Sequence, residues 1–443
     1  MKTLRGTFQS MHVRNFRLFF TGQLISQGGT WMQTIALNWL VLQLSHNNGF
    51  LVGLAIALQF LPTLLFGVWG GAIADRFDKR KVLLCTQVAM ASVAVVLTVL
   101  DVTGVVQLWM LYALVFTYGL ALAVDNPTRQ SFVSELVPPA DLPNAIGLSS
   151  AIFQLARVLG PALAGVLILA GGTAICFGLN AVSFAFVIVA LLMMRPEELH
   201  RSKPLGRQKG QLTDGLRYIW ETAELRWILL LMLVVGTFAI NSPVVLPLLA
   251  KITFDGGPAV YSWMSIAMGA GAMFGALFAA NRSDTHGRML FATGLAFGIA
   301  ICVASLAPSL ALFIALLVIV GAGQIAFLAT TNSSLQLLSD PTMRGRVMAV
   351  YTITLLGTTP IGGPMIGWIS DQFGPRWGFA VGGIATIAGV LVFGTAFLRA
   401  RRVNRDGMLA EQPADLVLGV DGEAIPASVG ESVSESTEGA LIR

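Results

Sequence analysis

One arginine lies deep inside an apolar stretch of the chain. Arg157 is about thirteen residues into the stretch 144–168, or roughly 20 Å at a helical rise of 1.5 Å per residue. All 23 Asp and Glu residues can be placed in loops, a tail or the ends of such stretches, so Arg157 is the only formal charge in the interior of one. Two interpretations are open: a group that attracts anions or donates hydrogen bonds in a central cavity, or an arginine satisfied by carbonyls or glutamines at a helix crossing.

Polar side chains line one face of two apolar stretches. Ser150, Gln154, Arg157 and Pro161 recur at spacings of four, three and four, which puts them on one face of a helix. The stretch 16–44 has a similar face, made of Gln23, Gln27, Thr30, Thr34 and Asn38. Such stripes either line a cavity or hold helices together by hydrogen bonds. The candidate cavity residues are Gln27, Gln154, Arg157, Asn241, Gln324 and Tyr351.

Residue patterns typical of catalysis or cofactor binding are missing from the sequence. There is no H-E-x-x-H pattern, and no Ser/His or paired-carboxylate set lies inside the apolar stretches. The chain has no Gly-Lys pair, so it lacks the loop that cradles ATP phosphates. Its three cysteines are far apart and lack metal-ligand spacing. We therefore expect no enzyme activity, no cofactor and no metal site.

The composition indicates a membrane protein. Of 443 residues, 55% are hydrophobic and 12% are charged, against about 25% charged in an ordinary soluble domain. Stretches of about 20 apolar residues match a hydrocarbon core of about 30 Å. We expect helical spans at 16–44, 50–74, 82–100, 107–124, 144–168, 173–194, 226–250, 258–281, 289–306, 309–331, 347–369 and 376–398. The first stretch is too long for a signal-peptide core and is expected to be retained.

The basic residues alternate with these spans. With the amino terminus in the cytoplasm, 25 of the 28 Lys and Arg fall on the cytoplasmic side; Lys251 and Arg376 fall on the other side and Arg157 lies within a span. An excess of Lys and Arg marks cytoplasmic loops. The sequence thus predicts a multi-pass protein of the cell (inner or plasma) membrane with both termini cytoplasmic, and a lipid bilayer rather than nucleic acid as the partner of its positive charge.

The two halves of the chain resemble each other. Gly160-Pro161 followed by Gly165 has a counterpart 203 residues later, in Gly363-Pro364 followed by Gly367. The segment that begins at Asp75 has a weaker counterpart at Asp284. We expect an N-terminal six-helix bundle at 1–194, a cytoplasmic linker at 195–225, a C-terminal six-helix bundle at 226–398 and a disordered cytoplasmic tail at 399–443. Transporters built from two repeats bind substrate between them near the midplane.

The clearest local motif is the segment 71–81, which reads GAIADRFDKRK. It resembles the signature loop of the major facilitator superfamily, whose pattern is Gly, three residues, Asp-Arg, any residue, Gly and two basic residues. Here Asp78 replaces the second Gly, which we interpret as a variation of the turn. The resemblance implies that the loop latches the two halves on the cytoplasmic side, and that Asp125 is the partner of Arg76.

Further motifs resemble one branch of that superfamily, which contains enterobactin exporters and macrolide or multidrug efflux proteins. They read NPTRQ (126–130), ELVP (135–138), LPNA (142–145), ARVLGPALAG (156–165) and RGRVM (344–348). The Gly-Pro element is also similar to the antiporter motif of drug–proton exporters, with part of its glycine pattern. The resemblance implies an all-α major facilitator fold with twelve transmembrane helices in two pseudo-symmetric bundles. The candidate gating and coupling residues are Gly71, Asp75, Arg76, Asp125, Arg129, Gly160 and Pro161.

We therefore expect a secondary active transporter that exports a siderophore, an antibiotic or another metabolite by alternating access, coupled to protons. The proton carrier would be Asp125 or the substrate itself, and the cavity would favour neutral or anionic substrates. An uptake transporter and a lipid flippase of the same fold are the alternatives, and a transporter-like receptor is the alternative without transport. The expected partners are a small-molecule substrate, protons and lipid, and the expected state is a monomer.

Overall fold

The computed structural model describes residues 8–200, 211–280, 287–410, 416–418 and 424–426. The chain divides into two compact units, residues 1–393 and 394–443, and each is described by itself. The counterpart expected at Asp284 lies outside the described residues, as does part of the linker.

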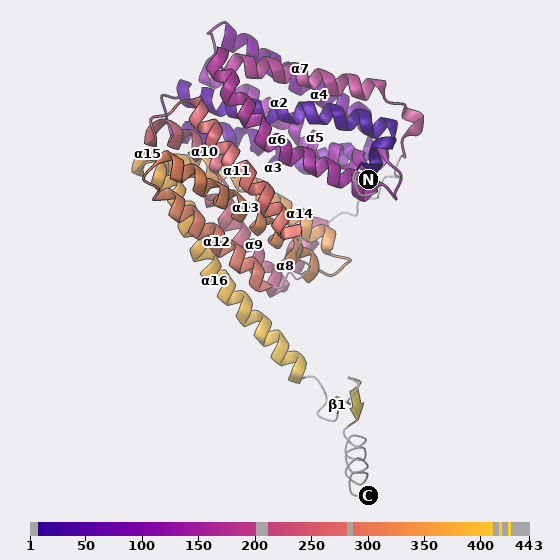
Figure 1. The fold of residues 1–443 in the computed structure, drawn as a ribbon. Helices are drawn as coiled ribbons and strands as arrows, with labels where there is room; N and C mark the ends of the chain where they lie inside the picture. Colours follow the sequence, from indigo (N-terminus) through magenta and orange to yellow (C-terminus); the bar gives the residue numbers. More distant parts are fainter. Residues whose placement is uncertain (1–7, 201–210, 281–286, 411–415, 419–423, 427–443) are drawn as a thin grey trace, which may run out of the picture. The chain divides into compact units, whose positions relative to one another are not determined.

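The first half of the chain contains one short 3-10 helix and six long helices, and the long helices run from indigo to magenta in Figure 1. They are η1 (Gln9–His12), α2 (Arg14–Leu44), α3 (Gly49–Arg76), α4 (Lys79–Val102), α5 (Leu108–Leu136), α6 (Leu142–Gly171) and α7 (Thr173–Met193). Their order and bounds follow the six expected spans. The main difference is α5, which continues twelve residues past the expected end at 124, because the polar side chains that follow are paired within the protein.

The linker and the second half are also helical. The linker contains η2 (Pro196–Glu198) and α8 (Gln211–Glu221). The second half contains α9 (Ala223–Phe238), α10 (Ser242–Leu248), η3 (Leu249–Thr253), α11 (Pro258–Ala280), α12 (Gly287–Ser305), α13 (Leu310–Leu338), α14 (Arg344–Gly357), α15 (Thr359–Phe373) and α16 (Pro375–Ala410). Two expected spans are each broken in the middle, 226–250 at residues 239–241 and 347–369 at Thr358. A proline closely follows each break, and proline cannot donate the helical hydrogen bond.

Nine of the described helical segments are long and apolar enough to cross a membrane. The other three expected spans correspond to α2, to the shorter apolar helix α12 and to the α14–α15 pair. The helices are consistent with twelve spans. Helix α2 does not reach the same apolarity because of its polar side chains.

Within residues 1–393, close helix pairs rest on small residues. In the first half α3 packs against α5, and α2 packs against α6 and α7; in the second half α13 packs against α11 and α12. A Cβ at Gly70 would lie 2.0 Å from the backbone oxygen of Ala123, and one at Gly271 would lie 1.9 Å from that of Val318. Glycine at such positions lets two backbones touch. The halves contact each other mainly through α3 with α15 and α6 with α11.

The last unit differs from the expected tail. We expected disorder from residue 399, whereas α16 continues to Ala410. This segment contains Leu, Ala and several Arg residues, which favour helix. Beyond it, β1 (Leu416–Leu418) pairs antiparallel with β2 (Ala424–Pro426).

Candidate functional site

Arg157 and Gln324 come from different halves of the chain and meet. Arg157 Nη2 donates to Gln324 Oε1 at 3.4 Å. The guanidinium carbon lies 5.9 Å from the centre of the Trp31 ring, within the range of a cation–π contact. Helices α6 and α11 touch beside this point, since a Cβ at Gly269 would lie 2.9 Å from the backbone oxygen of Arg157. Within the described part of the chain, no carboxylate pairs with Arg157.

The other candidate cavity residues lie apart from this pair. Gln27 Nε2 donates to Gln23 on the preceding turn of α2, at 3.4 Å. Gln154 is half-buried one turn before Arg157, and Tyr351 is buried on α14. Among the described residues, no hydrogen bond joins any of the three to Arg157 or Gln324, so the geometry brings together two of the six candidates.

Asn241 occupies the break between α9 and α10. Its Nδ2 donates to the backbone oxygen of Thr237 at 2.6 Å, which satisfies a carbonyl at the end of α9. Its Oδ1 is buried and accepts no hydrogen bond from the described residues. A Cβ at Gly362 would lie 2.2 Å from the same Thr237 oxygen, so the break is packed tightly against α15. Asn241 therefore stabilises a kinked helix.

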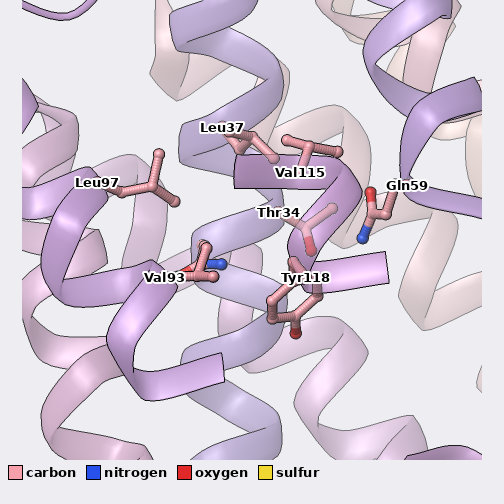
Figure 2. A pocket seen from close by; sticks show the side chains of 8 residues that line it. Thr34, Leu37, Gln59, Val93, Leu97, Val115 and Tyr118 are labelled. Atoms are coloured by element: carbon pink, nitrogen blue, oxygen red, sulfur yellow. The ribbon is translucent and has the colours of Figure 1, made fainter. Parts of the chain in front are cut away.

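A separate pocket lies inside the first half, among α2, α3, α4 and α5. Figure 2 shows its labelled side chains around a common space. It is lined by Gln33, Thr34, Leu37, Gln59, Val93, Leu97, Val115 and Tyr118. None of the six candidate cavity residues lines this pocket. Gln59 and Tyr118 were missed because each is an isolated polar residue in an otherwise apolar stretch.

Asp125 is the centre of a buried polar cluster. Its carboxylate accepts hydrogen bonds from Thr86 at 2.8 Å, from Gln87 at 2.9 Å and from Arg129 at 2.5 Å. The side chain of Asp125 is fully buried. Arg129 also donates to Gln23 of α2 at 3.3 Å. The cluster joins α2, α4 and α5 of the first half.

The expected pairing of Asp125 with Arg76 is wrong. Asp125 pairs with Arg129, which is one helical turn away on α5 and therefore needs no movement of another segment to reach it. Arg76 and Asp75 are exposed at the end of α3.

The segment 71–81 also differs in detail from its expected role. Asp78 caps α4, because its Oδ1 accepts hydrogen bonds from the backbone of Arg80 at 3.0 Å and of Lys81 at 3.3 Å. This explains why an aspartate fits at the second glycine position. Lys79 forms an ion pair with Glu135 at the end of α5. The glycine that lets α3 approach α5 is Gly70, and the candidate gating residue Gly71 is half-buried beside it.

The Gly160-Pro161 element brings α6 onto α2. Both residues are buried, and a Cβ at Gly160 would lie 2.4 Å from the Cβ of Trp31. The close contact places Trp31 beside Arg157. Gly160 thus helps to position the ring that faces the guanidinium.

The halves are fastened together at one end, where α3 begins and α15 ends. Both oxygens of Asp371 accept hydrogen bonds from the first turn of α3, from the N–H of Gly49 at 2.6 Å and of Phe50 at 2.9 Å. A Cβ at Gly53 would lie 2.2 Å from the backbone oxygen of Gly363, and one at Gly367 would lie 2.1 Å from that of Gly49. We call these residues the closed end.

Two further contacts join the halves near the closed end. Asn38 of α2 donates to the Tyr261 hydroxyl of α11 at 3.2 Å. A Cβ at Gly165 would lie 2.7 Å from the Cβ of Ser262. Asp371 was missed from the sequence, although it follows Gly367 of the repeated Gly-Pro element by one helical turn. A carboxylate at the end of a helix can equally be an ordinary loop residue.

Solved structures share this architecture. The peptide transporter POT aligns with a TM-score of 0.71 at 14% identity, over 88% of this chain and 95% of that one. A bacterial homologue of the human lysosomal transporter Spinster, in an inward-facing and unoccupied conformation, aligns with a TM-score of 0.66 at 16% identity, over 88% of this chain and 97% of that one. The likeness shows that the helical halves have the major facilitator fold.

Sequence comparison defines the family more narrowly. The chain belongs to the transmembrane secretion effector family of the major facilitator superfamily, which matches residues 5–423. The staphyloferrin A transporter of Staphylococcus aureus is 26% identical, over 85% of this chain and 95% of its own length. The multidrug efflux pump Tap of Mycobacterium tuberculosis is 27% identical, over 81% of this chain and 87% of its own. Macrolide efflux protein A of Streptococcus pyogenes is 24% identical, over 78% and 87%. The resemblance found in the sequence motifs is confirmed.

Proposed function

We propose that the protein is a secondary active transporter of the cell membrane that exports a small molecule by alternating access. Support comes from the family and from relatives whose names describe a siderophore transporter and two efflux proteins. A siderophore, an antibiotic or another metabolite of similar size is the proposed cargo. Uptake and lipid flipping are the alternatives that the same fold allows.

The observation that carries the proposal is the position of Arg157 at the boundary between the halves. Its guanidinium lies over the Trp31 ring and donates a hydrogen bond to Gln324, and it has no carboxylate partner among the described residues. An uncompensated charge in the membrane is costly, so a bound acceptor group that meets it is favoured. We assign Arg157 to a neutral or anionic acceptor group of the substrate, with Gln324 as the second hydrogen-bonding residue. A cationic group would be repelled at this point.

The closed end supplies one gate of the proposed cycle. The close backbone contacts between α3 and α15 support a gate that is shut at this end. With both termini in the cytoplasm, as the distribution of Lys and Arg predicts, the closed end faces the outside. Export then requires α3 and α15 to separate at Gly53 and Gly363 after the substrate has bound from the cytoplasmic side.

Asp125 is the proposed coupling residue. It is the buried carboxylate of a network that runs through Arg129 to Gln23 and Gln27 on the polar face of α2. Protonation of Asp125 would release Arg129 from a charge-assisted hydrogen bond and alter the partners of that face. This links a proton to a helix that touches both the pocket and the second half.

The test compares small molecules inside and outside cells that carry the wild type, Arg157→Ala, Arg157→Lys or no copy, by mass spectrometry. A charged hydrogen bond contributes about 1.5–3 kcal/mol, so Arg157→Ala is expected to weaken substrate binding roughly 10- to 150-fold. Arg157→Lys should keep part of the activity. Arg195→Ala, which changes an exposed arginine, is the control. If no compound depends on the wild-type protein, the exporter assignment fails; accumulation inside the cells would instead indicate uptake.

Coupling is tested separately, in vesicles with an imposed pH gradient. Asp125→Asn is expected to abolish transport driven by the gradient while exchange of labelled for unlabelled substrate continues. Equal gradient-driven flux in wild type and Asp125→Asn would exclude Asp125 as the proton carrier. A lipid flippase would be recognised by movement of a labelled phospholipid in the same vesicles.

A further inference from the structure

Helix α8 of the linker is attached to the second half by one face. The Tyr218 hydroxyl accepts a hydrogen bond from the backbone N–H of Asp340 at 3.1 Å, and Arg346 pairs with Asp214 at 3.3 Å. Ile219 is buried on the same side. Hydrogen bonds from Thr342 lower the pKa of Asp340. These contacts fix the orientation of α8 on α14.

The opposite face of α8 exposes apolar side chains. Leu216 and Trp220 are four residues apart, on one side of the helix, and are 49% and 64% exposed. Only Thr222 separates α8 from α9, the first apolar helix of the second half. The face must therefore lie close to the level at which α9 enters the membrane. Amphipathic helices and tryptophans at this level insert into the headgroup region.

Arg226 is held between two tryptophans at this point. Its guanidinium carbon lies 5.5 Å from the centre of the Trp220 ring and 4.9 Å from that of Trp227, and its Nη1 donates to the backbone oxygen of Trp220 at 3.0 Å. Trp227 is itself stacked on Phe393, with ring centres 6.1 Å apart. The aromatic contacts hold the guanidinium in one place before any ligand binds.

The charge of Arg226 is not neutralised by the described residues. Arg217 pairs with Glu221 at 2.8 Å and Asp214 pairs with Arg346, whereas no carboxylate pairs with Arg226. Glu224 lies in the first turn of α9, where the N-terminal end of the helix dipole stabilises its negative charge. Arg226 thus presents a fixed, unpaired cation beside exposed apolar surface. A group that is anionic at one end and apolar at the other matches it.

We propose that Trp220, Arg226 and Trp227 bind the phosphate of an anionic phospholipid in the leaflet on the linker side. The guanidinium takes the phosphate, and the faces of Leu216 and Trp220 lie along the glycerol and upper acyl chain. A free phosphate would use only the cation, so the exposed apolar residues favour lipid over a soluble anion. Because α8 is bonded to α14, the bound lipid is connected to one of the two broken spans.

The test uses the full-length protein, purified in detergent and titrated with phosphatidylglycerol or phosphatidylcholine, with bound lipid counted by native mass spectrometry. Wild type should retain phosphatidylglycerol in preference to phosphatidylcholine. Arg226→Ala should weaken retention roughly fivefold, as expected for one basic residue at an anionic surface. Arg217→Ala removes the same unit of charge and should change retention much less, since that guanidinium is engaged by Glu221. Trp220→Ala should also weaken retention, and Trp109→Ala, another exposed tryptophan, should not.

Several outcomes would overturn the proposal. Equal losses in Arg226→Ala and Arg217→Ala would indicate a diffuse charge effect with no specific site. Displacement of phosphatidylglycerol by inorganic phosphate would indicate an anion site that does not recognise lipid. Equal retention of the two lipids by wild type would remove the role of the cation. None of these variants changes a residue of the proposed substrate site. Their elution profile and thermal midpoint should match those of the wild type. A variant that unfolds is replaced by Arg226→Lys or Trp220→Leu, which should retain intermediate amounts of lipid.

Discussion

Adding one methyl group at Gly53 should open the closed end. In Gly53→Ala the new Cβ would lie 2.2 Å from the backbone oxygen of Gly363, and it must move away by about 1.2 Å to reach an ordinary contact of 3.4 Å. Because both partners are helical backbone, the two helices must separate. Overpacking of this kind costs about 1–3 kcal/mol. If this free energy destabilises only the closed state, the equilibrium shifts toward the open state by roughly 5- to 150-fold.

The assay follows a cysteine placed at the other contact between the halves, between α11 and α6. Ser262→Cys, in a chain whose three native cysteines are replaced, puts a buried thiol between α11 and α6. Its alkylation by a maleimide that does not cross the membrane should be slow in the parent and faster in Gly53→Ala by a factor in the range above. Gly67→Ala is the matched control on the same helix, since its Cβ would meet only Thr63, at 3.9 Å. If the rates in Gly53→Ala and Gly67→Ala are equal, the contact does not control opening.

Three further outcomes are expected. Asp371→Asn keeps the shape of the side chain but removes the negative charge at the start of α3. Charges at helix ends contribute about 0.3–1 kcal/mol, so alkylation of the Ser262→Cys thiol should become roughly two- to fivefold faster. An unchanged rate would show that the charge does not matter. Gly70→Ala should lower the thermal midpoint in detergent, because its Cβ would lie 2.0 Å from the α5 backbone, whereas Gly71→Ala should not; the reverse order would contradict the packing described. Asn180→Ala removes a buried hydrogen bond of 2.8 Å to Gln33, and should cost about 1 kcal/mol in unfolding of the bundle; no loss would mean that water or lipid replaces the partner.

The fold could be predicted because membrane helices are recognised in a sequence by their length and apolarity. The motifs at 71–81 and 126–165 identified the superfamily, and the fold and family comparisons confirm it. The C-terminal end of α5 could not be placed correctly, since the rule that ends a span at a charged residue fails where Asp125 and Arg129 neutralise each other inside the protein. The breaks near Asn241 and Thr358 could not be placed from the sequence, because a proline in an apolar stretch is compatible with either a kink or an uninterrupted helix.

The candidate site was predictable only in part. Arg157 stands out in the sequence because a charge in an apolar stretch is rare, whereas Gln324 is an isolated amide of the same kind as Gln59, which was missed. That the two touch depends on how α6 and α13 lie in three dimensions, which periodicity does not define. The same reason explains Gly70: two adjacent glycines differ by about 100° around the helix, and the sequence does not say which one faces α5. The roles of the candidate residues in binding, gating and coupling stay predictions.

The polar face of α2 has a consequence for how the protein is assembled. Three amides of α2 find partners on three different elements: Gln23 on α5, Gln33 on α7 and Asn38 on α11. Alone in a bilayer, α2 would hold these groups in hydrocarbon without hydrogen bonds, at a free-energy cost for each one. The helix should therefore leave the insertion machinery late, in company with α5 and α7, and its outer end should remain unsatisfied until α11 of the second half has been synthesised. A nascent chain stopped after α7 would then be a good substrate for membrane quality-control proteases.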